Sequence, residues 1–161
     1  FSKASLKREV RLQPVKLSSL VLEVLKREEA DDQVFQVGIS SAIQVQADPE
    51  MLRRAIGNLV RNAIRYAAKS GPVEIVALEQ NGRVLLSVRD HGPGVPESAL
   101  VRLFDPFYRP DQARTRESGG VGLGLAIVKS CVEACEGTVA VRNCEDGGLE
   151  VTLFLSAPAS S

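Results

Sequence analysis

The sequence predicts an α+β domain built as a two-layer sandwich of helices and a sheet. Three long segments have the apolar spacing of amphipathic helices. Two pairs of strand-like segments meet at residues that favour tight turns, Asn81-Gly82 in the first pair and Asp146-Gly147-Gly148 in the second. Strands and helices are interspersed without the strict strand–helix–strand alternation of a parallel sheet, which favours the α+β class.

The composition is typical of a soluble globular protein, with 44% hydrophobic and 25% charged residues. Lys plus Arg and Asp plus Glu each total 20, and this zero net charge argues against a broad nucleic-acid-binding surface. The cysteines, Cys131, Cys135 and Cys144, lack the spacing of a disulfide framework or a zinc site, so we interpret them as buried apolar residues. No segment approaches the roughly 20 apolar residues of a membrane span.

The elements follow from periodicity and from their ends. Helices are predicted for residues 17–32, 51–67, 97–104 and 122–137, and strands for residues 34–40, 43–48, 73–80, 83–90, 138–143 and 149–156. Asp48-Pro49-Glu50 begins the second long helix, because the acid caps free N–H groups and proline suits the first turn. Gly137 is expected to end the third long helix. The polar stretch 105–120 has no apolar period and is interpreted as a mobile loop.

One face of the second helix carries a set of residues suited to a nucleotide. Asn58 and Asn62 stand one turn apart, and Arg65 and Tyr66 lie within the next turn. Two asparagines alone are more often simply solvated. Here amide oxygens would suit Mg²⁺, which takes hard oxygen ligands and borrows others from phosphates and water. The guanidinium would suit a phosphate oxygen, and the ring would lie against a base.

The segment Asp90-His91-Gly92-Pro93-Gly94 follows a strand and has two interpretations. It could be only a tight turn. As the floor of a base pocket, its carboxylate would accept a hydrogen bond from the exocyclic amine of adenine and repel the carbonyl that guanine has there. The glycines would let the backbone approach a flat ring closely.

Two further segments are suited to phosphates. Gly120-Val121-Gly122-Leu123-Gly124-Leu125 leads into a helix, whose free N–H groups and positive dipole end hold anions. It follows no strand of a βαβ unit, which argues against a dinucleotide-binding Rossmann motif. It also lacks the Lys-Ser/Thr pair of a P-loop. Phe104-Asp105-Pro106-Phe107-Tyr108-Arg109 contains aromatics that could be core anchors. We interpret it as the hinge of a lid, from which Arg109 would swing toward a phosphate.

These four segments, in this order and spacing, resemble the N, G1, F and G2 boxes of the histidine-kinase branch of the ATPase/kinase (GHKL) superfamily shared with gyrase and Hsp90. NLVRNAIRY resembles the N box, DHGPG the G1 box, FDPFYRP the F box and GGVGLGLAIV the G2 box. The match covers roughly residues 15–155. The segment from FDPFYRP to GLAIV is also similar to envelope-stress (Cpx-type) sensor kinases. The resemblance implies the Bergerat fold, a mixed sheet of about five strands with three main helices and a mobile ATP lid.

The resemblance also implies how ATP and Mg²⁺ would bind. Asn62 would bind Mg²⁺ with support from Asn58, while Arg65 and Arg109 would meet phosphates and Asp90 would receive the adenine amino group. The complete set of implied nucleotide-binding residues is Asn58, Asn62, Arg65, Tyr66, Asp90, Gly92, Gly94, Val95, Phe104, Phe107, Arg109, Gly120, Val121, Gly122, Leu123, Gly124 and Leu125. Within this set, Asn58, Asn62, Arg65 and Arg109 would be catalytic.

One position favours transfer to histidine. Superfamily members that hydrolyse ATP or phosphorylate serine resemble one another in having a glutamate one turn before the metal-binding asparagine, as a base for water or a hydroxyl. Here that position is Asn58, whose amide cannot take a proton at neutral pH, whereas neutral imidazole already has a free lone pair. A GHKL-type conformational ATPase and a non-catalytic ATP-sensing module stay open as alternatives.

The acceptor histidine is expected on a separate part of the protein. His91, the one histidine of the chain, lies inside the nucleotide loop, and Phe1 in place of Met suggests a processed or excised piece.

Residues 1–13 are expected to be a linker or the remnant of an upstream dimerisation helix, residues 14–157 the catalytic ATP-binding domain and residues 158–161 a disordered tail. The expected partners are ATP, the dimerisation domain and a response regulator. Nucleic acid is not expected. The whole protein is expected to be anchored in a bacterial inner membrane, with this domain in the cytoplasm.

Overall fold

The protein folds around one mixed sheet, seen in a computed structural model that describes residues 9–105 and 121–159. Its strands are β1 (Gln13–Lys16), β2 (Phe35–Gly38), β3 (Gln44–Ala47), β4 (Val73–Gln80), β5 (Arg83–Arg89), β6 (Thr138–Asn143) and β7 (Leu149–Ser156). The sheet order is β1-β3-β7-β5-β4-β2, and β6 also pairs with β7. The β2–β4 pair is parallel and the other pairs are antiparallel.

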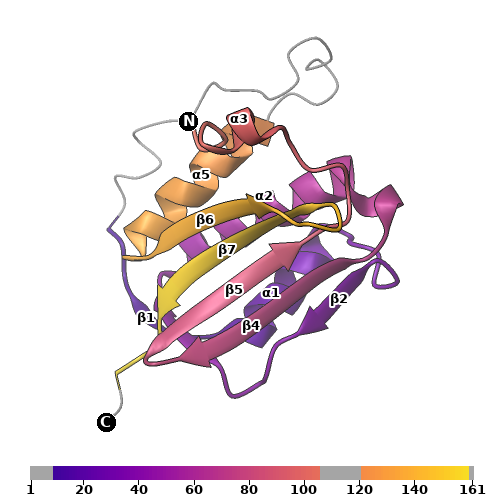
Figure 1. The fold of residues 1–161 in the computed structure, drawn as a ribbon. Coiled ribbons are helices and arrows are strands. Elements are labelled where there is room, and N and C mark those ends of the chain that lie inside the picture. The colour runs from indigo at the N-terminus through magenta and orange to yellow at the C-terminus, as the bar shows by residue number, and fades with distance from the viewer. Residues whose placement is uncertain (1–8, 106–120, 160–161) are drawn as a thin grey trace.

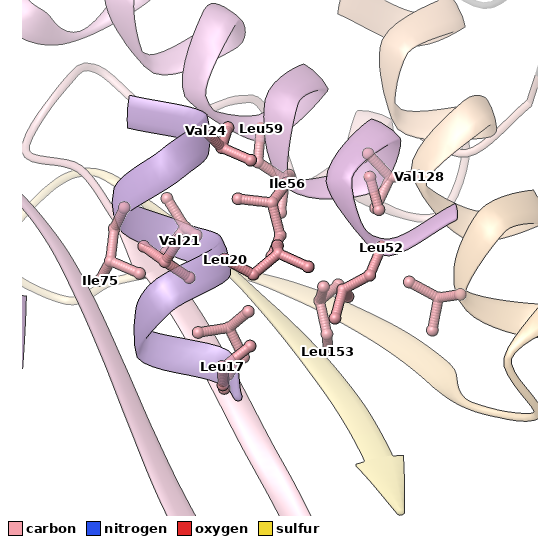
Figure 2. Close-up of a cluster of buried hydrophobic side chains, with 14 of the residues drawn as sticks. Leu17, Leu20, Val21, Val24, Leu52, Ile56, Leu59, Ile75, Val128 and Leu153 are labelled. Carbon is pink, nitrogen blue, oxygen red and sulfur yellow. The ribbon is translucent and has the colours of Figure 1, made fainter. Parts of the chain in front are cut away.

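The helices cover one face of this sheet, which confirms the predicted two-layer α+β sandwich (Figure 1). They are α1 (Leu17–Arg27), α2 (Pro49–Tyr66), the single turn α3 (Glu97–Leu100) and α5 (Val121–Ala134), with a short 3₁₀ helix η2 (Ala68–Ser70) after α2. The core lies between the helices and the sheet. Figure 2 shows side chains of α1, such as Val21 and Val24, gathered with Ile56 and Leu59 of α2. Each such side chain contributes roughly 1.5–3 kcal/mol by leaving water.

The start of α2 is fixed by Asp48, as predicted. Its Oδ1 accepts hydrogen bonds from the backbone N–H groups of Glu50 (3.0 Å) and Met51 (3.2 Å). Its Oδ2 accepts the N–H of Arg11 at 2.9 Å, and the residue is only 1% exposed. A buried carboxylate is stable here because the free N–H groups at the helix start surround it. The helix that carries Asn58 and Asn62 therefore has a defined first residue.

The sheet is larger than the predicted five strands, because seven are present in the described ranges. The strand β1 was not expected, since residues 1–13 were predicted to be a linker or the remnant of a helix and Pro14 follows them directly. Among the described strands, β1 pairs only with β3 and is an edge strand, where proline is tolerated. β2 and β3, which are neighbours in sequence, do not pair with each other. The predicted domain limits stay predictions, although β1 begins at Gln13 and β7 ends at Ser156.

The third long helix ends earlier than predicted. α5 stops at Ala134, and the left-handed residue after it is Glu136, with φ of 64°. The N–H of Gly137 then bonds the carbonyl of Val132 at 2.9 Å. Gly137 is required for another reason, because a Cβ at this position would lie 2.5 Å from the carbonyl oxygen of Phe154 in β7. In the described part of the chain, no helix has both the length and the apolar character needed to cross a membrane.

Gly57 provides a test of how α2 is built. A Cβ there would make ordinary contacts, 3.5 Å from Nη1 of Arg61 and 3.7 Å from Oε2 of Glu28. Glycine in a helix interior costs about 1 kcal/mol relative to alanine. We therefore expect Gly57→Ala to raise the free energy of unfolding by about 1 kcal/mol, measured by chemical denaturation. Gly137→Ala is the contrasting variant and is expected to lower it; a loss of stability in Gly57→Ala would contradict this description of the helix.

Candidate functional site

The C-terminal half of α2 presents two asparagines on one side. Asn58 and Asn62 are both half-buried. Nδ2 of Asn58 donates a hydrogen bond to the backbone carbonyl of Arg54 at 2.8 Å. This bond orients the amide, so that the oxygen Oδ1 of Asn58 is the atom left for a further partner.

Asn62 has a buried amide atom that lacks a partner. Its Nδ2 is buried and makes no hydrogen bond to the described residues. A buried polar group without a partner is unfavourable by about 1–3 kcal/mol, so such positions in native proteins call for an explanation. Rotation of the amide by 180° would exchange its nitrogen and oxygen. The position can therefore present an oxygen to a bound group.

The end of α2 approaches the loop that begins at Asp90. A Cβ on Gly92 would lie 3.1 Å from Cβ of Ala67, the residue that follows α2. One residue earlier, Tyr66 is half-buried, and Cζ of Arg65 lies 6.0 Å from the centre of its ring. The close approach of Gly92 to Ala67 brings the asparagine-bearing helix and the Asp90 loop to the same place.

Asp90 is held by backbone groups on both sides. Its Oδ1 accepts the N–H of Gly92 at 2.9 Å and the N–H of Leu149 at 3.1 Å. Its own N–H donates to the carbonyl of Leu149 at 3.0 Å. Both side-chain bonds use Oδ1, which leaves Oδ2 to accept a hydrogen from a ligand. The ring of His91 does not join this group, because its Nδ1 bonds the carbonyl of Pro72 at 2.8 Å.

Asn143 holds this loop, a role that was not predicted from the sequence. Oδ1 of Asn143 accepts the N–H of Val95 at 3.0 Å, and its Nδ2 donates to the carbonyl of Val95 at 2.6 Å. The two residues are 48 positions apart in the sequence. Nothing in the sequence around Asn143 indicated this contact, beyond its place at the end of a predicted strand. Gly94, with φ of +73°, lies directly against this side chain.

The remaining predicted residues fall into three groups. Gly122, Leu123 and Gly124 lie in the first turns of α5, where backbone N–H groups lack partners within the helix. Leu125 is only 3% exposed and belongs to the hydrophobic core. Val95 and Phe104 are partly buried and pack against this core. Phe107, Arg109, Gly120 and the predicted lid lie outside the described residues. The role of every one of these residues at a nucleotide stays a prediction.

A separate groove of about 460 Å³ lies between α1 and α2. It is lined by Val24, Arg27, Glu28, Glu50, Arg53, Arg54, Gly57 and Arg61. None of the predicted nucleotide-binding residues lines it. Part of its charge is already paired, since Arg53 contacts Glu23 at 2.7 Å and Arg61 contacts Glu28 at 2.5 Å.

The cysteines are free and buried, as predicted. Burial raises the pKa of Cys131 to about 11, so this thiol stays protonated and unreactive at neutral pH. Within residues 9–105 and 121–159, no group of three or more His, Cys, Asp or Glu side chains could hold a metal ion. A metal at the asparagine face of α2 would therefore depend on amide oxygens and on oxygens from its ligand.

Known proteins resemble this chain over most of its length. Residues 47–159 match the family of histidine kinase-, DNA gyrase B-, and HSP90-like ATPases. The sensor histidine kinase YkoH of Bacillus subtilis is 37% identical over 88% of this chain and 31% of its own length. The sensor histidine kinase CpxA of Escherichia coli is 42% identical over 67% of this chain and 23% of its own length. This chain thus spans less than a third of either relative.

A solved structure gives a fuller match. The histidine kinase domain of the E. coli osmosensor EnvZ is 31% identical, with a TM-score of 0.71, over 96% of this chain and 94% of that domain. The agreement extends over the whole fold and not only over the motifs. The chain therefore belongs to the histidine kinase-, DNA gyrase B-, and HSP90-like ATPase family, as an ATP-binding catalytic domain of the sensor histidine kinase type.

Proposed function

We propose that this domain binds ATP together with Mg²⁺ and transfers the γ-phosphoryl group to a histidine on a separate dimerisation domain. The observation that carries the proposal is the close approach of Gly92 to Ala67, which brings the Asp90 loop next to the C-terminal end of the asparagine-bearing helix α2. A nucleotide needs these groups at its two ends, a cation site at the phosphates and an acceptor at the base.

Asp90 is suited to select adenine. Its Oδ1 is occupied by two backbone N–H groups, and its Oδ2 is left to accept the exocyclic amine of the base. The same oxygen would face the carbonyl of guanine and repel it. The ring of Tyr66, at the end of α2, would lie against the base.

The residues on α2 fit Mg²⁺. The partnerless amide of Asn62 can present a hard oxygen, and Asn58 is oriented with its oxygen outward by the bond to Arg54. When bound, Mg²⁺ would neutralise phosphate charge and make the γ-phosphorus more open to attack. Arg65 would hold a phosphate oxygen from the same helix face.

The transfer itself needs positioning more than proton removal. The lone pair of the acceptor imidazole nitrogen would attack the γ-phosphorus, forming a P–N bond as the P–O bond to the β-phosphate breaks and ADP leaves. Asn58 stands where a general base would be needed for attack by water, and its amide cannot accept a proton. This favours histidine over water as the acceptor.

The partners and the location are proposals of the same kind. The relatives named as sensor kinases are over three times as long as their matched segments. We infer that this domain works with an upstream dimerisation domain and a response regulator, as the cytoplasmic part of a protein anchored in the inner membrane. The Cpx-type subclass stays a prediction, supported by the 42% identity to CpxA.

Replacing Asp90 tests the base contact. Asp90→Asn keeps the size and an oxygen but removes the negative charge, so we expect ATP to bind at least tenfold more weakly and the preference for ATP over GTP to shrink. Charge-assisted hydrogen bonds of this kind contribute about 1.5–3 kcal/mol. Calorimetric titration with both nucleotides measures this, with Glu145→Ala as an exposed control. Unchanged ATP affinity in a folded Asp90→Asn would show that Asp90 does not read the base.

Replacing Asn62 tests the cation site. Asn62→Ala is expected to weaken ATP binding about tenfold in Mg²⁺ and to change it little in EDTA, because only the metal-bound form loses a ligand. Arg53→Ala, in the groove between α1 and α2, serves as the control on the same helix. An equal loss with and without Mg²⁺ would place the effect of Asn62 on the nucleotide and not on the metal.

The transfer is tested by reconstitution. The domain is incubated with γ-labelled ATP and a separately produced helical hairpin that carries the acceptor histidine of the same protein. We expect acid-labile, base-stable phosphate on the hairpin and none on the domain alone. Rapid ATP hydrolysis without phosphohistidine would instead indicate a conformational ATPase, and ATP binding with neither reaction would indicate a sensing module.

A further inference from the structure

We propose that Asn143 is a positioning residue that sets the shape of the loop reading the base, so that affinity for adenine nucleotides depends on the β6–β7 hairpin. This inference rests on the proposed function, because it concerns the same loop from Asp90 to Val95. Asn143 does not contact the reacting atoms. Its effect would be to hold the loop in the conformation that receives adenine.

The side chain of Asn143 binds both polar backbone groups of one loop residue. It accepts the N–H of Val95 at 3.0 Å and donates to the carbonyl of Val95 at 2.6 Å. A primary amide can do this because it has a donor and an acceptor side by side. The two bonds satisfy the backbone N–H and carbonyl of Val95, which belongs to none of the strands in the described ranges.

The Asp90 end of the loop is bonded to Leu149, the residue paired with Asn143 in the β6–β7 hairpin. Asn143 and Leu149 are partners in the register of β6 and β7. The backbone N–H of Leu149 donates to the carboxylate Oδ1 of Asp90 at 3.1 Å, and the carbonyl of Leu149 accepts the backbone N–H of Asp90 at 3.0 Å. The loop between Asp90 and Val95 is thus fastened at both ends to two paired residues.

Glycines let the loop and hairpin come this close. A Cβ on Gly94 would lie 2.6 Å from Oδ1 of Asn143, and a Cβ on Gly148 would lie 1.9 Å from the carbonyl oxygen of Asp90. Both glycines also have positive φ, +73° and +98°. These two approaches leave no room for a side chain, so the contact between loop and hairpin is direct.

The hairpin turn does not itself need the Asn143 side chain. It is closed by backbone bonds from Cys144 N–H to the carbonyl of Gly148 at 2.9 Å and from Gly147 N–H to the carbonyl of Cys144 at 3.0 Å. An asparagine placed only for turn formation would bond locally. The amide of Asn143 instead bonds Val95, so its role belongs to the loop.

Loss of these bonds would let a loop with glycines at two positions populate other conformations. The apparent dissociation constant rises in inverse proportion to the fraction of molecules that hold the binding-competent form. ATP and ADP share the adenine and would both bind more weakly by the same factor. The dependence of binding on Mg²⁺ would not change.

The test uses hydrogen exchange and nucleotide titration on the same variants. In Asn143→Ala we expect the Val95 amide to exchange at least tenfold faster, and ATP and ADP each to bind about tenfold more weakly. Asn143→Asp keeps the acceptor and loses the donor, so Val95 N–H should stay protected while both nucleotides bind at least threefold more weakly. Glu145→Ala, exposed in the same hairpin, is the control and should match the parent.

The outcomes separate this inference from the proposed function. A parent protein that binds no ATP would overturn both. A parent that binds ATP, with either folded Asn143 variant binding ATP and ADP within twofold of the parent, would overturn the role of Asn143 alone. If Asn143→Ala does not fold, Asn143→Asp decides the question. Lower thermal stability with unchanged affinities would mean a purely structural residue and would also overturn the inference.

Discussion

The two-sided character of α2 is the constraint on which the site depends. Leu52, Ile56 and Leu59 are nearly completely buried among α1, α5 and the sheet, so the helix has one rotation about its axis that hides them. That rotation determines where Asn58 and Asn62 lie. The partnerless amide of Asn62 is tolerated because the buried stripe contributes far more stability than one unsatisfied group removes. Asp48 adds to this by defining where the helix begins.

The sheet supplies the other half of the site through β7. This strand pairs with β5, which ends just before Asp90, and with β6, which ends at Asn143. Its first residue, Leu149, bonds Asp90 on both the backbone and the carboxylate. The β6–β7 hairpin therefore connects the end of one strand with the loop at the end of another. Core packing orients the amides of α2, and sheet pairing positions the carboxylate of Asp90. The helix end and the loop approach each other at Ala67 and Gly92.

Much of this arrangement could be predicted from local pattern. The α+β class, the presence of three long helices, the cap at Asp48 and the two hairpins follow from periodicity and turn residues, and the structure confirms them. The first helix is shorter than predicted, because α1 ends at Arg27 and not at residue 32. The strand β1 could not be predicted, because a proline at an edge gives the same signal as a proline in a linker. Gly137 was predicted to end the third long helix, but α5 ends at Ala134, and a glycine is required at 137 because the carbonyl oxygen of Phe154 in β7 lies so close. The role of Asn143 could not be predicted for a similar reason, because its hydrogen-bond partner Val95 is distant in sequence.

The proposed function requires one ligand to contact the second half of α2, the Asp90 loop and the start of α5 together. The most direct measurement is a titration of the isotope-labelled domain with Mg²⁺ and ATP, followed through backbone amide shifts in NMR spectra. We predict that the largest shifts occur together at Asn58–Tyr66, at Asp90–Val95 and in the first turns of α5. Shifts confined to the groove between α1 and α2, around Arg27 and Arg53, would show that ATP does not bind at these three segments.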